Sequence, residues 1–247
     1  MEGRDHLRGA EPATGGPWPP GWAVWHVAET GSTNSDLLAA AVVDGVADRT
    51  VLVADHQSAG RGRLDRSWTA PPGANLLVSV LFRDVPPDPG ELTRRMGLAA
   101  VDAVFATTGR RATLKWPNDV LLDDLKLGGI LAQRAESGAV VVGLGLNVGW
   151  SPDGAVDLSD DAPDLQPAQV LRALLVAFDG LPADVTDRYR SSLATIGRRV
   201  RIELPAGELV GVATDVDADG RLVLLDDCAL THRVAVGDVV HLRSDGA

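Results

Sequence analysis

A loop rich in glycine and arginine is the first segment whose residue types could do chemistry. It reads AGRGRLDRSW (59–68), with Gly60 and Gly62 set among arginines and Trp68 at its end. Glycine lets a ligand approach the backbone closely, and guanidinium groups bind carboxylate or phosphate through paired hydrogen bonds. The loop therefore suits a small anion, although it lacks the Lys-Ser/Thr pair of a Walker phosphate loop. A flexible, solvated Arg-Gly loop is the alternative.

The segment KWPNDVLLDDLKLGGILAQ (115–133) is the second candidate. Asn118 and Asp119 stand at a strand-to-turn junction, and Lys126 opens a strand that contains a Gly-Gly pair. An acidic and a cationic group on adjacent hairpin strands could hold a metal-bound phosphate beside a substrate carboxylate. The alternative is a surface ion pair between Lys126 and the two aspartates shortly before it, which contributes little.

Two further segments carry polar residues in unusual places. Asn147 lies in the apolar, Gly-interrupted strand GLGLNVG (143–149), where its amide must find partners or cost about 1 to 3 kcal/mol. A ligand ring edge or a local backbone group would satisfy it equally well. Ser32, Thr33 and Asn34 open a predicted helix, where they can bind polar ligand atoms or simply cap the helix.

Lysine usage draws attention to the same region. Of 23 basic residues only Lys115 and Lys126 are lysines. In a chain that otherwise uses arginine, a lysine can mark a place that needs a compact ammonium, but a coding bias with chance survivors explains it too.

These residues require a mixture of helices and strands to position them. The apolar spacing predicts helices over 31–45, 91–107, 167–179 and 183–194, the first capped by Thr33 with Asp36 at its capping-box position. Strands are predicted over 50–55, 75–82, 112–116, 119–123, 126–134 and 139–148, partly joined as hairpins. A mixed sheet covered by helices follows, which is an α/β (α+β) fold.

The chain divides into three parts by composition. Residues 1–21 are rich in Gly and Pro without apolar periodicity and without a helix-turn-helix pattern, so we expect a mobile tail. Residues 22–196 form the main domain. Residues 197–247 contain short strands and turns such as DADG (217–220), typical of a small β-barrel or sandwich. We place the boundary near Ile196.

Charge and hydropathy exclude several classes of partner. The 23 basic and 34 acidic residues give a net charge of -11, which opposes attraction to nucleic acid or anionic membranes. No apolar run reaches the roughly 18 residues of a membrane span, and no signal sequence precedes the domain, so we expect a cytoplasmic protein. The lone Cys228 excludes an internal disulfide and is expected to be a small buried hydrophobe.

Together the four motifs closely resemble those of the biotin–protein ligase family. They occur in the order GSTN, HQSAGRGR..RSW, KWPND...KLGGIL and GLGLN, and the resemblance spans about Thr30 to Val148 plus the C-terminal β-domain. The absence of a DNA-binding pattern resembles the branch without repressor function. The resemblance implies a mixed-sheet catalytic domain related to lipoate ligases, followed by an SH3-like barrel. It also implies ATP and biotin as substrates, Mg²⁺ as the metal, and a biotin carboxyl carrier protein as the partner.

The resemblance assigns a role to each motif. The ureido head of biotin is bound by Ser32, Thr33, Asn34 and Gln57, with Gly60, Arg61, Gly62 and Arg63 folding over the ligand and Lys126, Gly128 and Gly129 completing its site. The ATP site comprises Arg63, Arg66, Trp68, Asn118, Asp119, Lys126 and Asn147. Lys126 and Arg63 are the expected catalytic cations, and Asp119 is the expected Mg²⁺ ligand.

One departure from the family pattern lies in the loop. Asp65 stands where many members have glycine, and Leu64 where a third arginine is common. We expect weaker retention of the adenylate, so an unchanged release rate in Asp65→Gly would contradict this expectation.

Three rival functions fit parts of the pattern. A lipoate or octanoate ligase would share the adenylate chemistry but use an apolar acyl pocket. A non-catalytic biotin or nucleotide binder would not need both Lys126 and Arg63. A nucleic-acid binder is disfavoured because the residues from Gly197 onward hold six arginines against nine acids (6 - 9 = -3). For the barrel, we hypothesise a role in ordering the nucleotide or docking the carrier.

Overall fold

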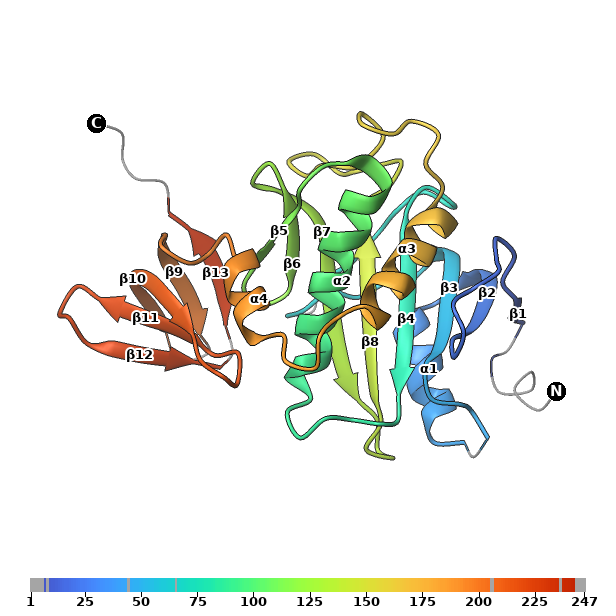
Figure 1. The fold of residues 1–247 in the computed structure, drawn as a ribbon, viewed down its shortest axis with the longest axis horizontal. Coiled ribbons are helices and arrows are strands. Elements are labelled where there is room, and N and C mark those ends of the chain that lie inside the picture. Colours follow the sequence, from blue (N-terminus) through green and yellow to red (C-terminus); the bar gives the residue numbers. More distant parts are fainter. Residues whose placement is uncertain are drawn as a thin grey trace.

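The computed structural model describes residues 7, 9–43, 45–64, 66–204, 207–235 and 237–242, which form two sheets and four helices (Figure 1). The large sheet has the order β1-β2-β3-β4-β8-β7-β6-β5. Its strands are β1 (Glu11–Pro12), β2 (Ala23–Thr30), β3 (Thr50–Gln57), β4 (Leu76–Phe82), β5 (Thr113–Lys115), β6 (Asp119–Leu122), β7 (Leu125–Arg134) and β8 (Val140–Leu146). Only β2 and β3 run parallel, so the sheet is mixed as predicted.

Helices cover both faces of this sheet (Figure 1). On one face α2 (Gly90–Thr108) and α3 (Pro167–Asp179) pack over a core that includes Val80 and Val142. On the other face α1 (Thr33–Ala41) packs over a second core that includes Leu81 and Val141. Successive strand side chains point to opposite faces, and here both directions are apolar. The strand β4 is accordingly buried at every position.

The second sheet is smaller and wholly antiparallel. It has the order β12-β11-β10-β9-β13 and comprises β9 (Arg199–Leu204), β10 (Gly207–Val216), β11 (Leu222–Asp226), β12 (Thr231–Val234) and β13 (Asp238–His241). Its β10–β11 turn contacts the main domain, where Trp116 Nε1 donates to Gly220 O over 2.9 Å. The division near Ile196 remains our proposal, and it lies between α4 (Thr186–Ser192) and β9.

Part of the expected N-terminal tail is attached to the large sheet. The short strand β1 pairs with β2, and Trp18 Nε1 donates to Ala13 O over 3.1 Å. Residues 1–6 and 8 of that tail lie outside the described residues. The strand β2 itself was absent from the sequence prediction.

The helix predicted over 183–194 is confirmed in a shorter form as α4. Two other local predictions are wrong. Ser32, and not Thr33, is the N-cap of α1, its side chain makes no capping hydrogen bond, and the Thr33 hydroxyl turns toward β3 and β4. Cys228 is exposed because it lies in the β11–β12 turn, where its N–H donates to Asp226.

Within the described residues, no helix is long and apolar enough to cross a membrane.

Candidate active site

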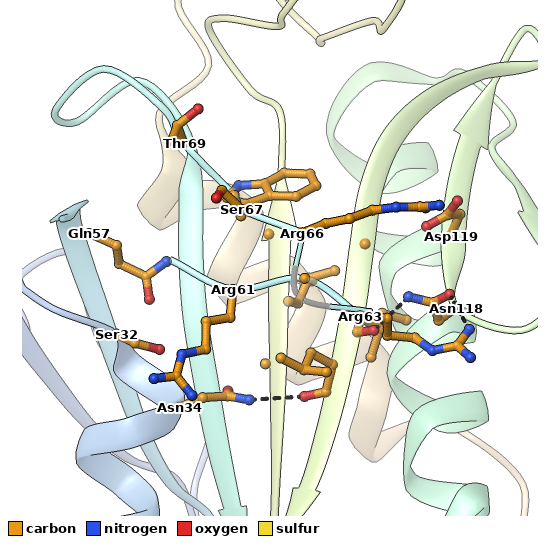
Figure 2. Close-up of a pocket in the computed structure, with 18 of the residues that line it drawn as sticks. Ser32, Asn34, Gln57, Arg61, Arg63, Arg66, Ser67, Thr69, Asn118 and Asp119 are labelled. Carbon is orange, nitrogen blue, oxygen red and sulfur yellow. Dashed lines mark hydrogen bonds between the residues drawn. The ribbon is translucent and has the colours of Figure 1, made fainter. Parts of the chain in front are cut away.

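A cavity opens where the start of α1, the end of β3 and the loop after β3 meet the β6–β7 hairpin and β8 (Figure 2). It contains all the predicted site residues except Gly60 and Gly128, which do not line it. Side chains missed by the sequence prediction also line it, namely Leu64, Ser67, Thr69, Val78, Ser79, Ile130, Leu131, Leu144, Pro152, Ala155 and Asp238. The four motifs therefore converge on one pocket.

One end of the cavity, called the neutral end below, is lined by uncharged hydrogen-bonding side chains, and a single cation, Arg61, reaches toward it. The Thr33 backbone N–H donates to Gln57 Oε1 over 2.8 Å, which leaves the Gln57 NH₂ group for other partners. The Thr33 and Ser79 hydroxyl oxygens are 2.7 Å apart, and Ser79 donates to Asn34 Oδ1 over 2.6 Å. Figure 2 shows Ser32, Asn34 and Gln57 together on this side, with the Arg61 side chain extending toward them.

Glycine in β8 is required by this neutral end. A Cβ added to Gly143 would lie 2.3 Å from Asn34 Oδ1, so any side chain there would push Asn34 away. This contact explains the first glycine of GLGLN, which the sequence prediction left without a role.

The opposite end of the cavity is charged. Lys126 Nζ lies 2.7 Å from Asp119 Oδ1 across the β6–β7 hairpin. Arg63 donates to Asn118 Oδ1 over 3.1 Å and to Gly237 O of the small domain over 3.0 Å. Burial lowers the pKa of Arg63, and the carboxylates of Asp238 and Asp119 oppose this shift. An arginine guanidinium stays charged at neutral pH.

The surface ion pair suggested for Lys126 is wrong. Asp123 pairs with Arg110, and Asp124 pairs with Arg198. Because both aspartates are engaged elsewhere, Lys126 turns to Asp119 and faces the cavity.

The Gly/Arg loop is a small hairpin that closes one side of the cavity. The backbone N–H of Trp68 donates to the Gly60 carbonyl oxygen over 2.9 Å, and an antiparallel β-bridge joins Arg61 to Ser67. A Cβ on Gly60 would lie 2.3 Å from Trp68 O, so this position needs glycine for the close approach. Arg66 forms an ion pair with Asp238 of the small domain. Asp65 lies outside the described residues, and its effect remains a prediction.

Trp68 lies flat against glycines of the sheet. A Cβ on Gly145 would be 2.5 Å from Trp68 Cε2, and one on Gly129 would be 3.4 Å from Cζ3. Lys126 Nζ is 5.8 Å from the ring centroid. The indole N–H is buried and has no hydrogen-bond partner among the described residues. A buried donor of this kind favours a ligand acceptor beside the ring.

Asn147 is held by local groups. It is 2% exposed, its Oδ1 accepts from Asn75 over 3.1 Å, and its Nδ2 donates to Val156 O over 3.0 Å. Asn75 in turn accepts from the Val148 N–H. Local groups therefore satisfy part of the Asn147 amide, as one of the two predictions from the sequence held, and one Nδ2 hydrogen remains for a ligand.

The donor set suits Mg²⁺ carried by phosphates rather than a protein cage. Within the described residues, no group of three or more His, Cys, Asp or Glu side chains is arranged to hold a metal ion. Asp119 supplies one carboxylate at the charged end, beside Asn118. Because Mg²⁺ often takes one or two carboxylates plus substrate phosphates, these residues fit that mode of binding.

Two missed residues had no usable signal in the sequence. Ser79 is one polar residue in an apolar strand, and Asp238 is 172 positions from the Arg66 that it pairs with. Only the folded chain brings them to the cavity.

The cavity can bind a molecule with an uncharged polar head and an anionic tail. Apolar side chains, including Val78 and Leu144, line the cavity together with the groups of its two ends. The cations at the charged end suit a reaction in which two anionic groups meet.

Known proteins match both parts of the chain. Residues 29–149 match the biotin/lipoate A/B protein ligase family, and residues 195–242 match the biotin protein ligase C-terminal domain. A biotin–[acetyl-CoA-carboxylase] ligase of Mycobacterium tuberculosis is 44% identical over 88% of this chain and 88% of its own. A ligase of the same name from Paracoccus denitrificans is 31% identical over 80% of this chain and 92% of its own.

The fold is also found among solved structures. The biotin protein ligase from Aquifex aeolicus in complex with biotin and ATP has a TM-score of 0.77 at 25% identity, and the match covers 90% of this chain and 99% of that one.

Proposed function

Because the chain belongs to the biotin protein ligase family, as its four motifs predicted, we propose that it uses ATP to attach biotin to a lysine of a carrier protein. The carboxylate of biotin attacks the α-phosphate of ATP, an acyl-phosphate bond forms, and pyrophosphate leaves. The amine of the acceptor lysine then attacks the acyl carbon, and AMP leaves. The acceptor is a biotin carboxyl carrier protein or domain, in keeping with relatives named for acetyl-CoA carboxylase.

The observation that carries this proposal is the polarity of the two ends of the cavity. Ser32, Thr33 and Gln57 offer uncharged hydrogen-bonding groups at one end, and Arg63 and Lys126 offer positive charge at the other. Figure 2 shows Ser32 and Gln57 at the first end, with Arg61 extending toward it, and Arg63 at the second. A ureido ring matches the first end. A carboxylate that meets a phosphate matches the second.

Lys126 and Arg63 are the cations that we assign to the first step. A carboxylate attacking a phosphate brings two anions together, so fixed cations stabilise the charge that develops in the transition state. Arg63 is held by Asn118 and the small domain before any substrate binds, which lowers the reorganisation that the step requires. Lys126 would leave Asp119 for the substrate oxygens.

Mg²⁺ would be held by phosphate oxygens together with Asp119, and when bound it supplies charge neutralisation between the phosphates. The match between residues and metal rests on the Asp119 carboxylate, which lies beside Asn118. Releasing Lys126 from Asp119 frees both the ammonium and the carboxylate for these two tasks.

The loop hairpin and Trp68 protect the intermediate. A mixed anhydride hydrolyses readily, so a loop that closes over it and excludes water preserves it until the carrier arrives. We assign Trp68 to the adenine ring and Asn147 to its edge, with Arg66 near the phosphates. The unpartnered indole N–H and the remaining Nδ2 hydrogen of Asn147 support these assignments. A reaction that consumes ATP also suits the cytoplasmic location expected from the sequence.

The experiment that tests the proposal is intact-mass analysis of a biotin carboxyl carrier domain. The carrier is incubated with this protein, ATP and Mg²⁺, and with either biotin or lipoate. We expect a mass increment of one biotinyl group that requires ATP. An increment from lipoate alone would establish the lipoate ligase alternative, and tight biotin binding without any increment would establish a non-catalytic binder.

A further inference from the structure

A buried chain of hydrogen bonds runs behind the neutral end of the cavity. Asn34 Nδ2 donates to the backbone carbonyl of Leu131 over 3.1 Å and to Gln133 Oε1 over 2.9 Å. Asn34 Oδ1 accepts from the Ser79 hydroxyl over 2.6 Å, and Ser79 Oγ is 2.7 Å from Thr33 Oγ1. Ser79 is fully buried and Thr33 is 3% exposed, so bulk water does not compete for these groups.

The direction of this chain is set at its far end. A carbonyl oxygen only accepts, so Leu131 fixes the NH₂ group of Asn34 toward itself and leaves Oδ1 toward Ser79. Because Oδ1 also only accepts, the single hydrogen of Ser79 is used there. The 2.7 Å contact between Ser79 and Thr33 then needs a hydrogen from Thr33.

Gln57 is the competing acceptor for the Thr33 hydrogen, and it is the weaker one. Its Oε1 lies 3.0 Å from Thr33 Oγ1 but already accepts the Thr33 backbone N–H over 2.8 Å. Either choice leaves one pair of oxygens without a hydrogen between them, and this is less unfavourable at the 3.0 Å contact with Gln57 than at the 2.7 Å contact with Ser79. The Thr33 hydroxyl therefore donates to Ser79 and keeps a lone pair for a ligand.

We propose that Ser79 is a positioning residue that fixes Thr33 as a hydrogen-bond acceptor, so that the neutral end selects a ligand with an N–H donor at that point. The inference rests on the proposed function, in which the ligand there is the ureido ring of biotin. Ser79 contacts Thr33, which binds the ring, and sets the direction of the Thr33 hydroxyl hydrogen. Ser79, which contacts Thr33, thereby sets the preference for a ring N–H over a ring oxygen.

The test compares biotin with its two cyclic carbamate analogues, each with one ureido N–H replaced by a ring oxygen. Dissociation constants are measured calorimetrically, without ATP, for the wild type and Ser79→Ala. One of the two analogues places its ring oxygen against the Thr33 lone pair, and the wild type is expected to bind it about 100-fold more weakly than biotin. In Ser79→Ala the Thr33 hydroxyl can turn its hydrogen to Gln57 Oε1 or to that ring oxygen, so this ratio is expected to fall by up to about tenfold.

A double-mutant cycle separates the proposed role from general loosening of the pocket. In a Thr33→Val background, Ser79→Ala is expected to leave the ratio within about twofold, because no hydroxyl remains to be oriented. Thr50→Val is the matched control. It removes another buried hydroxyl, which donates to Ala47 O over 2.8 Å at the other end of β3, and it should leave the ratio unchanged.

The outcomes distinguish this inference from the proposed function. A wild type that does not bind biotin overturns the proposed function. A wild type that binds biotin, with the same ratio in Ser79→Ala, overturns only the role of Ser79. If Ser79→Ala does not fold, Ser79→Cys takes its place, because a thiol is a weak donor and acceptor and should give an intermediate ratio. A wild-type ratio in Ser79→Cys would then overturn the inference.

Discussion

Lys126 and Asp119 form an ion pair across the β6–β7 hairpin, with Nζ 2.7 Å from Oδ1, at the charged end of the cavity. The lysine side chain is 40% exposed and the aspartate side chain 17% exposed, so the pair is open to substrate from the side of the lysine. In the proposed reaction, each partner of this pair is released when the substrate phosphates and Mg²⁺ bind.

Replacing Lys126 should abolish most of the activity. In Lys126→Ala the transition state loses a fixed cation, and we expect carrier biotinylation to fall about 100- to 1000-fold with the fold intact. Intact-mass time courses of the carrier measure this. Lys115→Ala is the matched control, since it removes the other lysine, which does not line the cavity, and it should stay within about twofold of the wild type. Equal loss in both variants would contradict a specific role for Lys126.

Adding a methyl group at Gly145 should displace Trp68. The new Cβ would lie 2.5 Å from Cε2 and 2.7 Å from Nε1 of the indole. Because stacking of a base on an aromatic ring contributes about 1 to 3 kcal/mol, we expect the KM for ATP in Gly145→Ala to rise roughly tenfold. Pyrophosphate release at varied ATP measures it, and biotin affinity measured without ATP should change little.

The control for this variant is Gly180→Ala, where the added Cβ would be no closer than 3.5 Å to its neighbours. It should leave the KM for ATP unchanged. An unchanged KM in Gly145→Ala as well would place the adenine away from Trp68.

The small domain should contribute to retention of the intermediate through Asp238. This carboxylate pairs with Arg66 of the loop and also opposes the lowering of the pKa of Arg63. A partly exposed pair contributes at most about 1 kcal/mol, so we expect Asp238→Asn to release biotinyl-adenylate up to about fivefold faster. Chasing labelled adenylate from the enzyme gives the rate.

A second carboxylate of the small domain supplies the comparison. Asp227 pairs with Arg199 over 2.7 Å, away from the loop, and Asp227→Asn should release the adenylate at the wild-type rate. If both variants behave like the wild type, the contact between Asp238 and Arg66 does not help to retain the adenylate.

Most of the predicted site residues line one cavity because local signals in the sequence coincide there. In the sequence, the strands β6, β7 and β8 are apolar runs separated by short turns. Short turns join antiparallel neighbours, so the hairpin pairing of these strands could be predicted. In that pairing Asp119 lies opposite Gly129 and Lys126 opposite Leu121, so the two side chains meet diagonally across the hairpin. Glycines in the loop and in β8 were visible as a pattern, but which side chain presses on each was not.

The rest depended on contacts between distant segments. Ser79 is an ordinary strand serine until α1 places Thr33 and Asn34 against it. The partner of Arg66 is supplied by a different sheet. The prediction for Cys228 failed for a similar reason. Its exposure is decided by the turn in which it lies, and the residue type alone does not reveal that turn.

Acid should weaken the protein through His241, which lies on β13 near the main domain. Its Nε2 is 3.2 Å from Thr195 Oγ1, and burial, together with the charges of Lys115 and Arg198, lowers its pKa from 6.5 to about 4. The folded chain therefore keeps this ring neutral, while the unfolded chain protonates it near its ordinary pKa. The stabilisation is complete above about pH 6.5 and is lost as the pH falls toward 4.

A variant without an ionisable ring isolates this contribution. After a discount for the partial exposure of His241, protonation in the unfolded chain lowers the free energy of unfolding by about 1 kcal/mol, or Tm by roughly 2 to 4 °C. We expect Tm to fall between pH 7 and 4.5 by that much less in His241→Gln than in the wild type. Parallel curves for the wild type and His241→Gln in thermal unfolding would show that His241 has the same proton affinity in the folded and unfolded chain.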